Sequence, residues 1–311
     1  MLDLGIIGYK NHAKRITDIL KKKYNLKYTY HPTKTINVKG FTNNIEDLLR
    51  TDCIFVLCPS KNHFFYLNYL NKKKYDGYIF CEKIPVTKIN ELKKISKFKN
   101  NKTFFNFNLR YSILSKFLKK NKLLGNLLSI NIFDLKPIIE KKEIKKNWRM
   151  NFKDTLITNN LVHYLDLIIH NFSKKIEKIN ILSNKSNKNF KIIDNLIISF
   201  KISKKIFNIN LSYSSGLEKL YLLYFSKGKI EINDSEIRIY YPNNKIDNKG
   251  RLKKPNIYKR IKIKNIFNES NLKSVNYFMN IVKNKKKISK RDSLTAFDTN
   301  KLILQISNNL K

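Results

Sequence analysis

The feature that most restricts the fold is a series of short apolar runs, separated by helix-like segments, in the first third of the chain. The runs at 52–58 and 77–82 are almost continuously apolar, which is typical of strands buried on both faces of a parallel sheet. Strand alternating with helix predicts a doubly wound α/β sheet. Further strands are expected at 3–8, 26–31 and 103–108, and helices at 12–24, 62–72 and 88–98.

The second half of the sequence has a different pattern. Strand-like segments follow one another with short polar connections, which predicts a largely antiparallel open sheet in an α+β domain. The fold class is therefore an N-terminal Rossmann-like doubly wound parallel sheet followed by a C-terminal α+β domain. The expected strands are 127–134, 176–182, 192–200, 205–213, 219–225, 229–233 and 236–241, with helices at 158–172, 271–283 and 293–309.

The charge of the chain suggests an anionic partner. Its 64 Lys and Arg against 23 Asp and Glu give a formal net charge of +41, for which nucleic acid is the first candidate. However, only eight of the basic residues are arginine, whose planar fork clamps phosphates and reads bases, and the lysines are spread along the whole sequence. We therefore do not expect a nucleic-acid partner. The positive field should instead attract small anions such as dinucleotides or sugar nucleotides.

Composition excludes several other classes. A hydrophobic fraction of 42% over 311 residues excludes a disordered chain. No apolar run reaches the roughly 18 residues needed to span a bilayer, and no basic segment followed by an apolar one opens the sequence, so we expect a cytoplasmic protein without a membrane span. Cys53, Cys58 and Cys81 lie in apolar runs and are expected to be reduced core thiols. No cluster of ligand side chains predicts a metal.

The turn after the first strand, Gly8-Tyr9-Lys10-Asn11-His12-Ala13, occupies the place of the Gly-x-Gly-x-x-Gly turn of dinucleotide-binding folds. Gly8 and Ala13 fit that pattern. Lys10 does not, because its side chain would crowd a pyrophosphate, although its ammonium group would also pair with one. The helix N-terminus favours an anion in either case. Two interpretations stay open: a cofactor-binding turn formed by Gly8, Lys10, Asn11, His12 and Ala13, and a similar turn that binds nothing.

The end of the second strand bears on the choice of nucleotide. NAD enzymes usually carry a carboxylate there for the ribose 2′-hydroxyl, but this strand ends in Tyr30-His31-Pro32-Thr33-Lys34. Thr33 and Lys34 would suit a 2′-phosphate, which inclines the prediction towards NADP. The alternative is that both are solvated loop residues.

Taken in order, these segments resemble the Gfo/Idh/MocA family of NAD(P)-dependent sugar oxidoreductases, and the likeness covers nearly the whole chain. Each motif alone is nonspecific, and the resemblance lies in their order. The motifs are Gly5-Ile-Ile-Gly8, the stretch 52–63 that ends in Pro and His, Cys81-Glu82-Lys83-Ile84-Pro85, Asn108-Leu-Arg110-Tyr111, Trp148-Arg149, His163-Tyr-Leu-Asp166, Asn276-Tyr-Phe-Met and Ser293-Leu-Thr-Ala-Phe-Asp.

The resemblance implies domains and roles. Residues 1–118 would bind a dinucleotide and 119–311 would bind substrate and mediate oligomerisation, with the option that the final helix packs back on the first domain. The catalytic residues would be Lys83, near the nicotinamide and the substrate hydroxyl, His163, which moves the hydroxyl proton, and Asn159. Besides the first turn, cofactor contacts would come from Thr33, Lys34, Cys58, Pro59, His63, Glu82 and Lys83, and substrate contacts from Asn108, Arg110, Trp148, Arg149 and His163.

Several of these residues also have a purely structural interpretation. Glu82 would organise the nicotinamide-side loop or only cap a turn, and His63 would contact the cofactor or cap a helix. His163 lies on an apolar helix face, where a histidine is often a satisfied core residue. Arg110 and Arg149 stand out among so many lysines, and their forks would bind a sugar phosphate or carboxylate, or form internal salt bridges.

The sequence also departs from the family pattern. Asn159 replaces an acidic residue four positions before His163, and an amide cannot relay a proton as a carboxylate can. Leu161 replaces a common glycine, and Pro85 comes one residue later than in the Glu-Lys-Pro motif. Together with Lys10, these changes leave open both a divergent active enzyme and a degenerate relative that binds a nucleotide or sugar or acts as a scaffold.

The expected function is hydride transfer between a nicotinamide cofactor, NAD or NADP, and a hydroxyl or keto group of a sugar or sugar nucleotide. Surface-carbohydrate biosynthesis is one setting for such a reaction. The resemblance further implies a homo-oligomer, either a dimer or a tetramer.

Overall fold

The structure is a computed structural model, and it describes residues 1–98, 101–118, 123–137, 155–172, 176–186, 192–242, 245–253 and 255–310. The chain forms two compact units, one of residues 1–111 with 270–310 and one of residues 112–269. The sequence placed a domain boundary between 118 and 119. In the structure the chain leaves the first unit at Tyr111 and returns to it at Ser270, within helix α7 (Ile266–Lys283).

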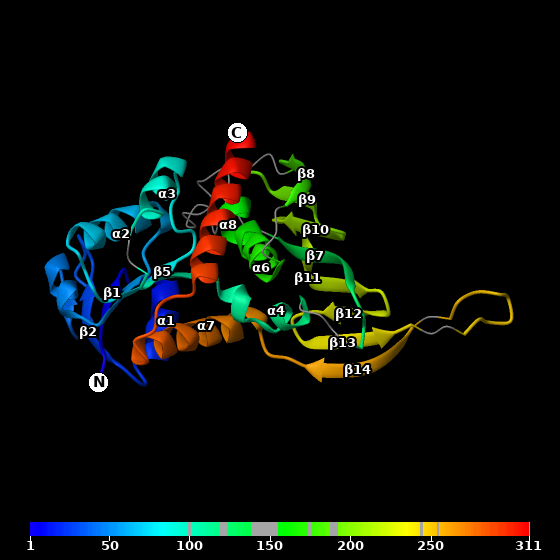
Figure 1. Cartoon of the computed structure of the whole chain (residues 1–311), viewed down its shortest axis with the longest axis horizontal. Helices are drawn as coiled ribbons and strands as arrows, with labels where there is room; N and C mark the ends of the chain where they lie inside the picture. The colour runs from blue at the N-terminus through cyan, green and yellow to red at the C-terminus, as the bar shows by residue number, and fades with distance from the viewer. Residues whose placement is uncertain are drawn as a thin grey trace. The chain divides into compact units, whose positions relative to one another are not determined.

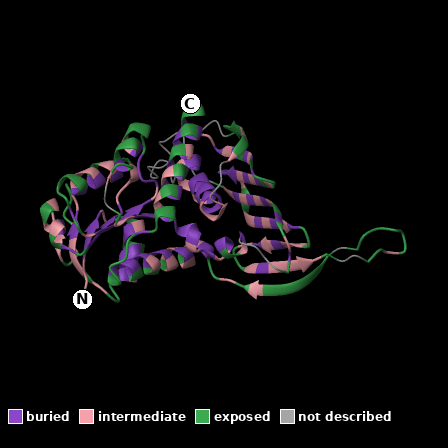
Figure 2. Ribbon diagram, viewed as in Figure 1, coloured by how far each residue is buried: buried purple, intermediate pink, exposed green. Residues whose placement is uncertain are grey.

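The first unit is built on a six-stranded sheet in the order β3-β2-β1-β4-β5-β6, and every neighbouring pair is parallel. β4 and β5 are buried at every position, as expected for strands covered on both faces (Figure 2). The strand order reverses between β1 and β4, which makes this edge the topological switch point. The strands are β1 (Asp3–Ile7), β2 (Asn25–Tyr30), β3 (Phe41–Thr42), β4 (Cys53–Val56), β5 (Tyr78–Glu82) and β6 (Thr103–Asn106).

Helices cover both faces of this sheet, so the predicted doubly wound α/β architecture is confirmed (Figure 1). α1 (Asn11–Leu20) and α7 share one apolar cluster with Phe55, Phe80 and Phe104 of the sheet, and the rings of Phe80 and Phe278 lie 5.2 Å apart. On the other face Phe105 contacts Phe297 of α8 (Lys290–Asn309), with ring centroids 5.5 Å apart. The remaining elements are α2 (His63–Lys72), α3 (Ile89–Ile95) and the short 3-10 helices η1 (Ile45–Arg50), η2 (Ser60–Asn62) and η3 (Asn108–Tyr111).

The second unit is built on an eight-stranded sheet in the order β14-β13-β12-β11-β7-β10-β9-β8. Among its described strands only β7 and β10 pair in parallel, so the predicted largely antiparallel sheet is confirmed. Its strands are β7 (Leu127–Pro137), β8 (Glu177–Asn184), β9 (Asn195–Ile202), β10 (Lys205–Ser212), β11 (Ser214–Phe225), β12 (Gly228–Ile232), β13 (Glu236–Tyr241) and β14 (Asn256–Lys262).

Helix α6 (Val162–Phe172) covers one face of this sheet, and a π-helical turn, Ile157–Leu161, precedes it. Buried and partly exposed residues alternate along β9 and β10, which gives the sheet an inner face and an open one (Figure 2). The unit also contains the short helix α4 (Ile113–Leu118). Within the described residues no helix is both long and apolar enough to cross a membrane, and no group of three or more potential metal ligands occurs.

Candidate active site

The first candidate site lies at the carboxyl ends of β1, β4 and β5. Gly8, which ends the first strand, has a φ of +89°, and its amide donates to the Tyr30 carbonyl at 3.1 Å. A Cβ atom at this position would lie 3.0 Å from Cα and 3.1 Å from the amide nitrogen of Cys58. Both the left-handed backbone and the close approach of the loop after β4 therefore require glycine. This contact joins Gly8 to Cys58 and its neighbour Pro59, three residues that the sequence singled out.

Lys10 does not need to be glycine for its backbone, because its φ of −102° and ψ of −178° are ordinary extended values. It is the N-cap of α1, where its solvent-exposed side chain makes no capping hydrogen bond, and the first turn of the helix carries no acidic residue. Of the other turn residues, Asn11 is exposed and Ala13 is buried. The N-terminus of α1 therefore keeps a positive dipole end without a side chain that neutralises it.

The loop after β2 adds positive charge near this turn. The amides of Thr33 and Lys34 donate to Nδ1 of His31, at 3.3 and 3.1 Å. Burial lowers the pKa of His31, and the charges of Lys34 and Lys10 lower it further. The same charges that disfavour an imidazolium favour an anion at the ends of β1 and β2.

A partly buried contact between His12 and Glu82 joins the first turn to the end of β5. The Nε2 atom of His12 lies 2.9 Å from Oε1 of Glu82, and the same oxygen accepts from Nδ2 of Asn106 at 2.6 Å. The amide oxygen of Asn106 in turn accepts from the Ser274 hydroxyl at 2.6 Å. The chain of contacts thus connects α1, β5, β6 and α7 beneath the carboxyl edge of the sheet.

The two charged partners shift each other's pKa in opposite directions. The negative charge of Glu82 raises the pKa of His12, against the effect of burial. Burial alone would raise the pKa of Glu82, but the charge and hydrogen bond of His12 and the hydrogen bond of Asn106 outweigh it and hold that pKa below its usual range. Each partner therefore favours the charged form of the other.

The sequence analysis named His12 and Glu82 as separate cofactor contacts and did not identify Asn106 or Ser274. Asn106 ends a strand-like apolar run, where a buried amide is a weak sign of a buried network. Ser274 lies in a helix 168 residues further along the chain, so no local pattern connects the two.

His63 fastens the loop after β4 to the loop after β5. Its ring is fully buried, with Nδ1 2.7 Å from the Ile84 carbonyl and Nε2 2.9 Å from the Cys58 carbonyl. Carbonyl oxygens only accept, so both contacts are hydrogen bonds only when the ring is protonated. Burial lowers the pKa of His63 and opposes that form. In either form the ring lies between the two loops, which is a positioning role.

Lys83 lies in the loop that these contacts hold. The Ser60 hydroxyl donates to the Lys83 carbonyl at 3.3 Å, and the Lys83–Ile84 peptide bond is cis. Two residues on, Val86 exchanges hydrogen bonds with the Asn300 side chain of α8, at 3.0 and 3.1 Å. The Lys83 side chain itself is half-buried, so a rigid loop carries a partly accessible amine.

The cysteines of this region are unsuited to nucleophilic chemistry. Burial raises the pKa of Cys58 to about 12 and the pKa values of Cys53 and Cys81 well above the usual thiol range. The nucleophile is the thiolate, and these values keep the groups protonated. All three are free, as the sequence predicted.

Two predicted substrate residues of the first unit are occupied by internal contacts. The Arg110 side chain is only 1% exposed, with Nη1 2.9 Å from the Asp292 carbonyl and 3.7 Å from its carboxylate. Asn108 is buried and donates to the Ser270 hydroxyl at 2.8 Å. Of the two interpretations of Arg110, the structure therefore supports the internal salt bridge. We do not include Arg110 or Asn108 in the candidate site. Trp148 and Arg149 lie outside the described residues.

The second unit holds His163 and Asn159 at the start of α6. Both side chains are half-buried, while their neighbours Asn160 and Tyr164 point into the sheet, where each donates to Oδ2 of Asp134 at 2.9 Å. The π-helical turn before α6 places Asn159 and Asn160 on different sides of the helix start. Such turns are frequent at functional sites.

Tyr213 and Phe267 complete this cluster. The hydroxyl of Tyr213 donates to Oδ1 of Asn160 at 2.6 Å, so both ends of the Asn160 amide are fixed. The His163 ring meets the Phe267 ring edge-on, with centroids 5.5 Å apart. One side of the His163 ring therefore contacts an aromatic ring.

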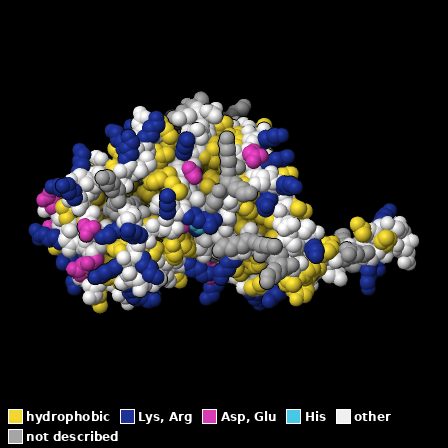
Figure 3. Space-filling model, viewed as in Figure 1, with side chains coloured by type: hydrophobic (Ala, Val, Ile, Leu, Met, Phe, Trp, Pro, Cys, Tyr) yellow, Lys and Arg dark blue, Asp and Glu magenta, His cyan; other side chains and the backbone are white. Residues whose placement is uncertain are grey.

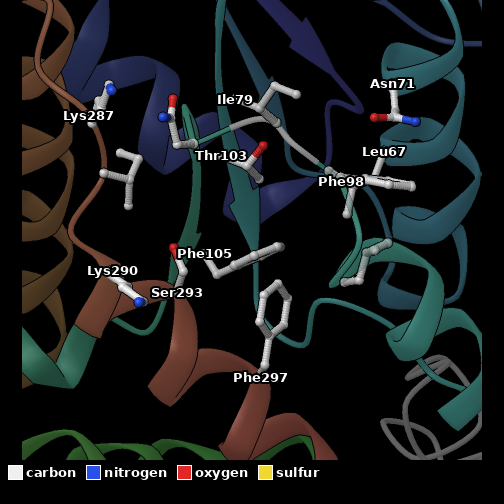
Figure 4. Close-up of a pocket in the computed structure, with 13 residues that line it drawn as sticks. Leu67, Asn71, Ile79, Phe98, Thr103, Phe105, Lys287, Lys290, Ser293 and Phe297 are labelled. Carbon is white, nitrogen blue, oxygen red and sulfur yellow. The ribbon is translucent and has the colours of Figure 1, made fainter.

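A cavity of about 380 Å³ in the first unit lies apart from these residues. It sits beside the amino ends of β5 and β6, between Ile79, Thr103, Phe105 and Phe297, with Lys287 and Lys290 at its edge (Figure 4). Ligands of open α/β sheets bind at the carboxyl ends of the strands. This cavity lies at the amino ends and is therefore not the expected dinucleotide site.

Positive side chains are spread over the visible surface rather than gathered in a single patch (Figure 3). This distribution agrees with the spread of lysines along the sequence. On the face shown, they do not form the continuous basic stripe that is typical of a nucleic-acid-binding surface.

No protein-family model and no curated protein matches this sequence. Solved structures do match over almost the full length. Levoglucosan dehydrogenase, in complex with NADH and levoglucosan, superposes with a TM-score of 0.78 at 11% identity, covering 100% of this chain and 98% of that one.

Two further neighbours have similar scores. Myo-inositol 2-dehydrogenase from Lactobacillus plantarum has a TM-score of 0.75 at 17% identity and covers 100% and 98% of the two chains. UDP-N-acetylglucosamine 3-dehydrogenase from Acidithiobacillus ferrooxidans has a TM-score of 0.76 at 11% identity and covers 99% and 97%.

These neighbours are dehydrogenases of the Gfo/Idh/MocA type, and the chain has their fold. The resemblance that the sequence motifs indicated is therefore confirmed at the level of the fold, over both units. At identities of 11% to 17% the comparisons show the architecture and leave the activity to be argued from the site.

Proposed function

We propose that this chain is an NAD(P)-dependent oxidoreductase that interconverts a hydroxyl and a keto group on a sugar or sugar nucleotide. The observation that carries the proposal is the Gly8 turn, a glycine at positive φ at the switch point of the sheet, followed by a helix N-terminus without a side-chain cap. The neighbours support it, because their names include NADH and sugar, inositol and sugar-nucleotide substrates.

The residues around this turn fit a dinucleotide. A diphosphate would be held at the N-terminus of α1, whose first turn contains no acidic residue, with Lys10 supplying positive charge. The backbone amides of Thr33 and Lys34 are taken by His31, but both side chains are exposed, and a hydroxyl with an ammonium group suits the 2′-phosphate of NADP. We therefore propose NADP as the preferred cofactor.

The chain's own residues would handle the proton. A bound nicotinamide supplies the hydride acceptor or donor, and oxidation of a hydroxyl also releases a proton that a base must take. Lys83, held by its rigid loop, and His163, at the start of α6, are the proposed bases. Asn159 would only orient a neighbour by hydrogen bonding, because an amide does not exchange a proton at this pH.

The open face of the second sheet supports self-association. Ile197 and Ile206 lie on it and are 42% and 44% exposed, which is unusual for large aliphatic residues of neighbouring strands. We propose a dimer or tetramer formed through this face, in a protein of the cytoplasm. Surface-carbohydrate biosynthesis would be one use of the reaction.

The test begins with cofactor binding, measured by the fluorescence of NADH and NADPH during titration with the protein. We expect binding of at least one, with NADPH the tighter. Failure of both to bind at millimolar concentration would refute the redox function. Binding of a nucleotide without turnover of any sugar or sugar nucleotide in a broad panel would instead favour the degenerate, ligand-binding relative.

The Lys83→Met variant then tests the proton step. Removal of a positioned general base lowers rate constants by about 10²–10⁴-fold, so we expect kcat to fall by that factor while the dissociation constant of the cofactor changes little. Lys88→Met, an exposed lysine at the N-cap of α3, is the control and should retain full activity. An unchanged kcat in Lys83→Met would remove Lys83 from the mechanism.

A further inference from the structure

Two lysines of the second unit lie on the sheet face that α6 covers. Lys219 of β11 stands directly opposite Asp134 of β7, and Lys136 follows Asp134 by two residues, which places it on the same face. Asp134 marks that face, because it accepts hydrogen bonds from Asn160 and Tyr164 beside α6. Two ammonium groups are thus brought to the end of the sheet where α6 begins.

Lys219 is an unusually enclosed lysine. Its side chain is only 17% exposed, and its Nζ atom lies 4.0 Å from the centroid of the Phe267 ring. Burial lowers the pKa of Lys219, as does the repulsion of Lys136, while Asp134 and Asp234 act in the opposite direction. Its ion pair with Asp234 is long, 3.8 Å, and Asp234 is itself half-exposed.

Lys136 is held in a similar way. Its Nζ atom lies 5.2 Å from the centroid of the Tyr213 ring, and that ring is fixed by the hydrogen bond of its hydroxyl to Asn160. An ammonium group over an aromatic face loses part of its hydration without gaining a formal counter-ion. Both ammonium groups therefore lie over aromatic rings, and Lys219 has in addition one long ion pair with the half-exposed Asp234.

Among the described residues, Asp134 is the buried carboxylate that faces this pair. Oδ2 of Asp134 is engaged by Asn160 and Tyr164, at 2.9 Å each, and faces two cations rather than one. Lys136 and Lys219 thus share one buried carboxylate, Asp134, while the second carboxylate near them, Asp234, is half-exposed and lies 3.8 Å from Lys219. Like charges held together in a partly desolvated place are unfavourable in isolation, and an anion that joins them relieves that repulsion.

Phe267 connects this pair to the proposed catalytic histidine. The same ring that lies under Lys219 meets the His163 ring edge-on. An anionic group bound by the lysines would therefore be held beside the imidazole, at a distance set by the width of one aromatic side chain.

We propose that Lys136 and Lys219 form an anion subsite that binds a carboxylate or phosphate group of the substrate next to His163. The substrate is then an acidic sugar, such as a uronate or a sugar phosphate, rather than a neutral one. This assignment deepens the proposed function and rests on it for the role of His163, while binding of the anion rests on the lysines alone.

Binding can be measured without turnover. The chain has five histidines, so the imidazole signals in a proton–carbon NMR spectrum are few, and His163 is identified by its loss in His163→Asn. We expect titration with D-glucuronate or D-glucose 6-phosphate to shift this signal at lower concentration than titration with D-glucose. D-galactose and its corresponding acid and phosphate extend the panel to a second configuration.

Substitutions then separate the two lysines from the general positive field. Lys219→Met and Lys136→Met should each weaken binding of the acidic sugars by about tenfold or more, since a charge-assisted contact is lost. Binding of the neutral sugar should not change, and Lys219→Arg should restore most of the affinity. Lys205→Met is the matched control, because Lys205 of β10 also lies over an aromatic ring, 5.8 Å from the centroid of Phe172 in α6, but outside the subsite.

The outcomes divide cleanly. A stronger response to the uronate or to the phosphate identifies which anion the subsite prefers, and both support it. Equal affinity for neutral and acidic sugars, or an equal loss in Lys205→Met and Lys219→Met, would overturn the subsite. If the wild-type protein bound the acidic sugars but neither NADH nor NADPH, the proposed redox function would be refuted and the anion subsite would still be supported.

Discussion

In the first unit the buried carboxylate of Glu82 is matched by a charged partner, His12, whereas in the second unit the buried carboxylate of Asp134 is matched by neutral donors. Asn106 adds a second hydrogen bond to Glu82, and Asn160 and Tyr164 supply both donors to Asp134. The cations nearest Asp134 lie over aromatic rings.

This difference separates two uses of buried polar groups. Around Glu82 the charges cancel internally, and the network joins loops that are 70 residues apart in the sequence, so its contribution is to hold the site in shape. Around Asp134 two lysines share one buried carboxylate, and the other carboxylate, Asp234, is half-exposed. Cations held in a partly desolvated place are available to a ligand. The first network is suited to positioning and the second to recognition.

Among the predicted variants, Gly8→Ala should show the largest loss of stability, because it changes the backbone that positions the site in the first unit. The new methyl group would meet the Cys58 backbone at 3.0 Å on a residue at a φ of +89°. Strain of this kind costs about 1–3 kcal/mol, and the clash with backbone adds to it, so we expect a loss of about 2–4 kcal/mol in unfolding free energy. Cofactor affinity should fall as well.

Gly216→Ala in β11 is the matched control in the other unit. Its Cβ would have open space on all sides, so its stability should stay within about 0.5 kcal/mol of the wild type. Hydrogen exchange of peptides from each unit shows where protection is lost. If both variants were equally stable, the close approach at Gly8 would not be a constraint on the fold.

Much of the architecture could be predicted because the first unit obeys a simple physical rule. Strands buried on both faces must be apolar at nearly every position, so β4 and β5 can be predicted from this one sequence. Gly8 was identified for a related reason, since a backbone at positive φ beside another strand end leaves few alternatives to glycine.

Other elements leave no such signal. β14 was not predicted, because it is a sheet-edge strand exposed at almost every position and its sequence carries no alternation. The pairing of His12 with Glu82 was also missed, although both residues were named. Long-range contacts between polar side chains depend on the order of the strands in the sheet. The local hydrophobic pattern of the sequence does not predict that order.

The second cluster illustrates the same limit. His163 and Asn159 were found through the resemblance, but Lys136 and Lys219 were two among very many lysines. What distinguishes them is the ring beside each: Phe267 of α7 is 48 residues from Lys219, and Tyr213, between β10 and β11, is 77 residues from Lys136. In a chain with a net charge of +41, the sequence does not show which lysines would bind a ligand. Their burial in the folded chain distinguishes these two from the exposed lysines.

Replacing the two carboxylates by their amides gives a direct comparison of the networks. Glu82→Gln removes the charge that His12 pairs with inside the fold, and we expect a loss of about 2 kcal/mol. Asp134→Asn keeps an oxygen that accepts from Asn160 or Tyr164, and its loss should be about 1 kcal/mol or less.

Chemical denaturation at neutral pH measures both amide variants. Asp134→Asn should in addition tighten binding of acidic sugars, because it removes the negative charge beside Lys219. An equal loss of stability in both variants would mean that the His12–Glu82 charge pair adds nothing beyond its hydrogen bonds.

The smallest expected effect is the pH dependence of stability that the ion pair confers. Because Glu82 raises the pKa of His12 above 6.5, the stabilisation is fully present below that value and is lost as the pH rises through the folded-state pKa. On the acid side, the pKa of Glu82 lies below 4.5, so its contribution is present above 4.5 and is lost as the pH falls through its own folded-state pKa.

A comparison of wild type with His12→Asn from about pH 6 to about pH 9 isolates the histidine. The wild type should lose at most about 1 kcal/mol relative to the variant as the pH rises, since the side chain of His12 is 34% exposed and solvent screens part of the interaction. His31→Asn should act in the opposite sense, because the lowered pKa of His31 penalises the folded chain below pH 6.5 instead. Parallel pH profiles for wild type and His12→Asn would show that the pair does not titrate in this range, and the electrostatic contrast between the two networks would then be reduced to their hydrogen bonds.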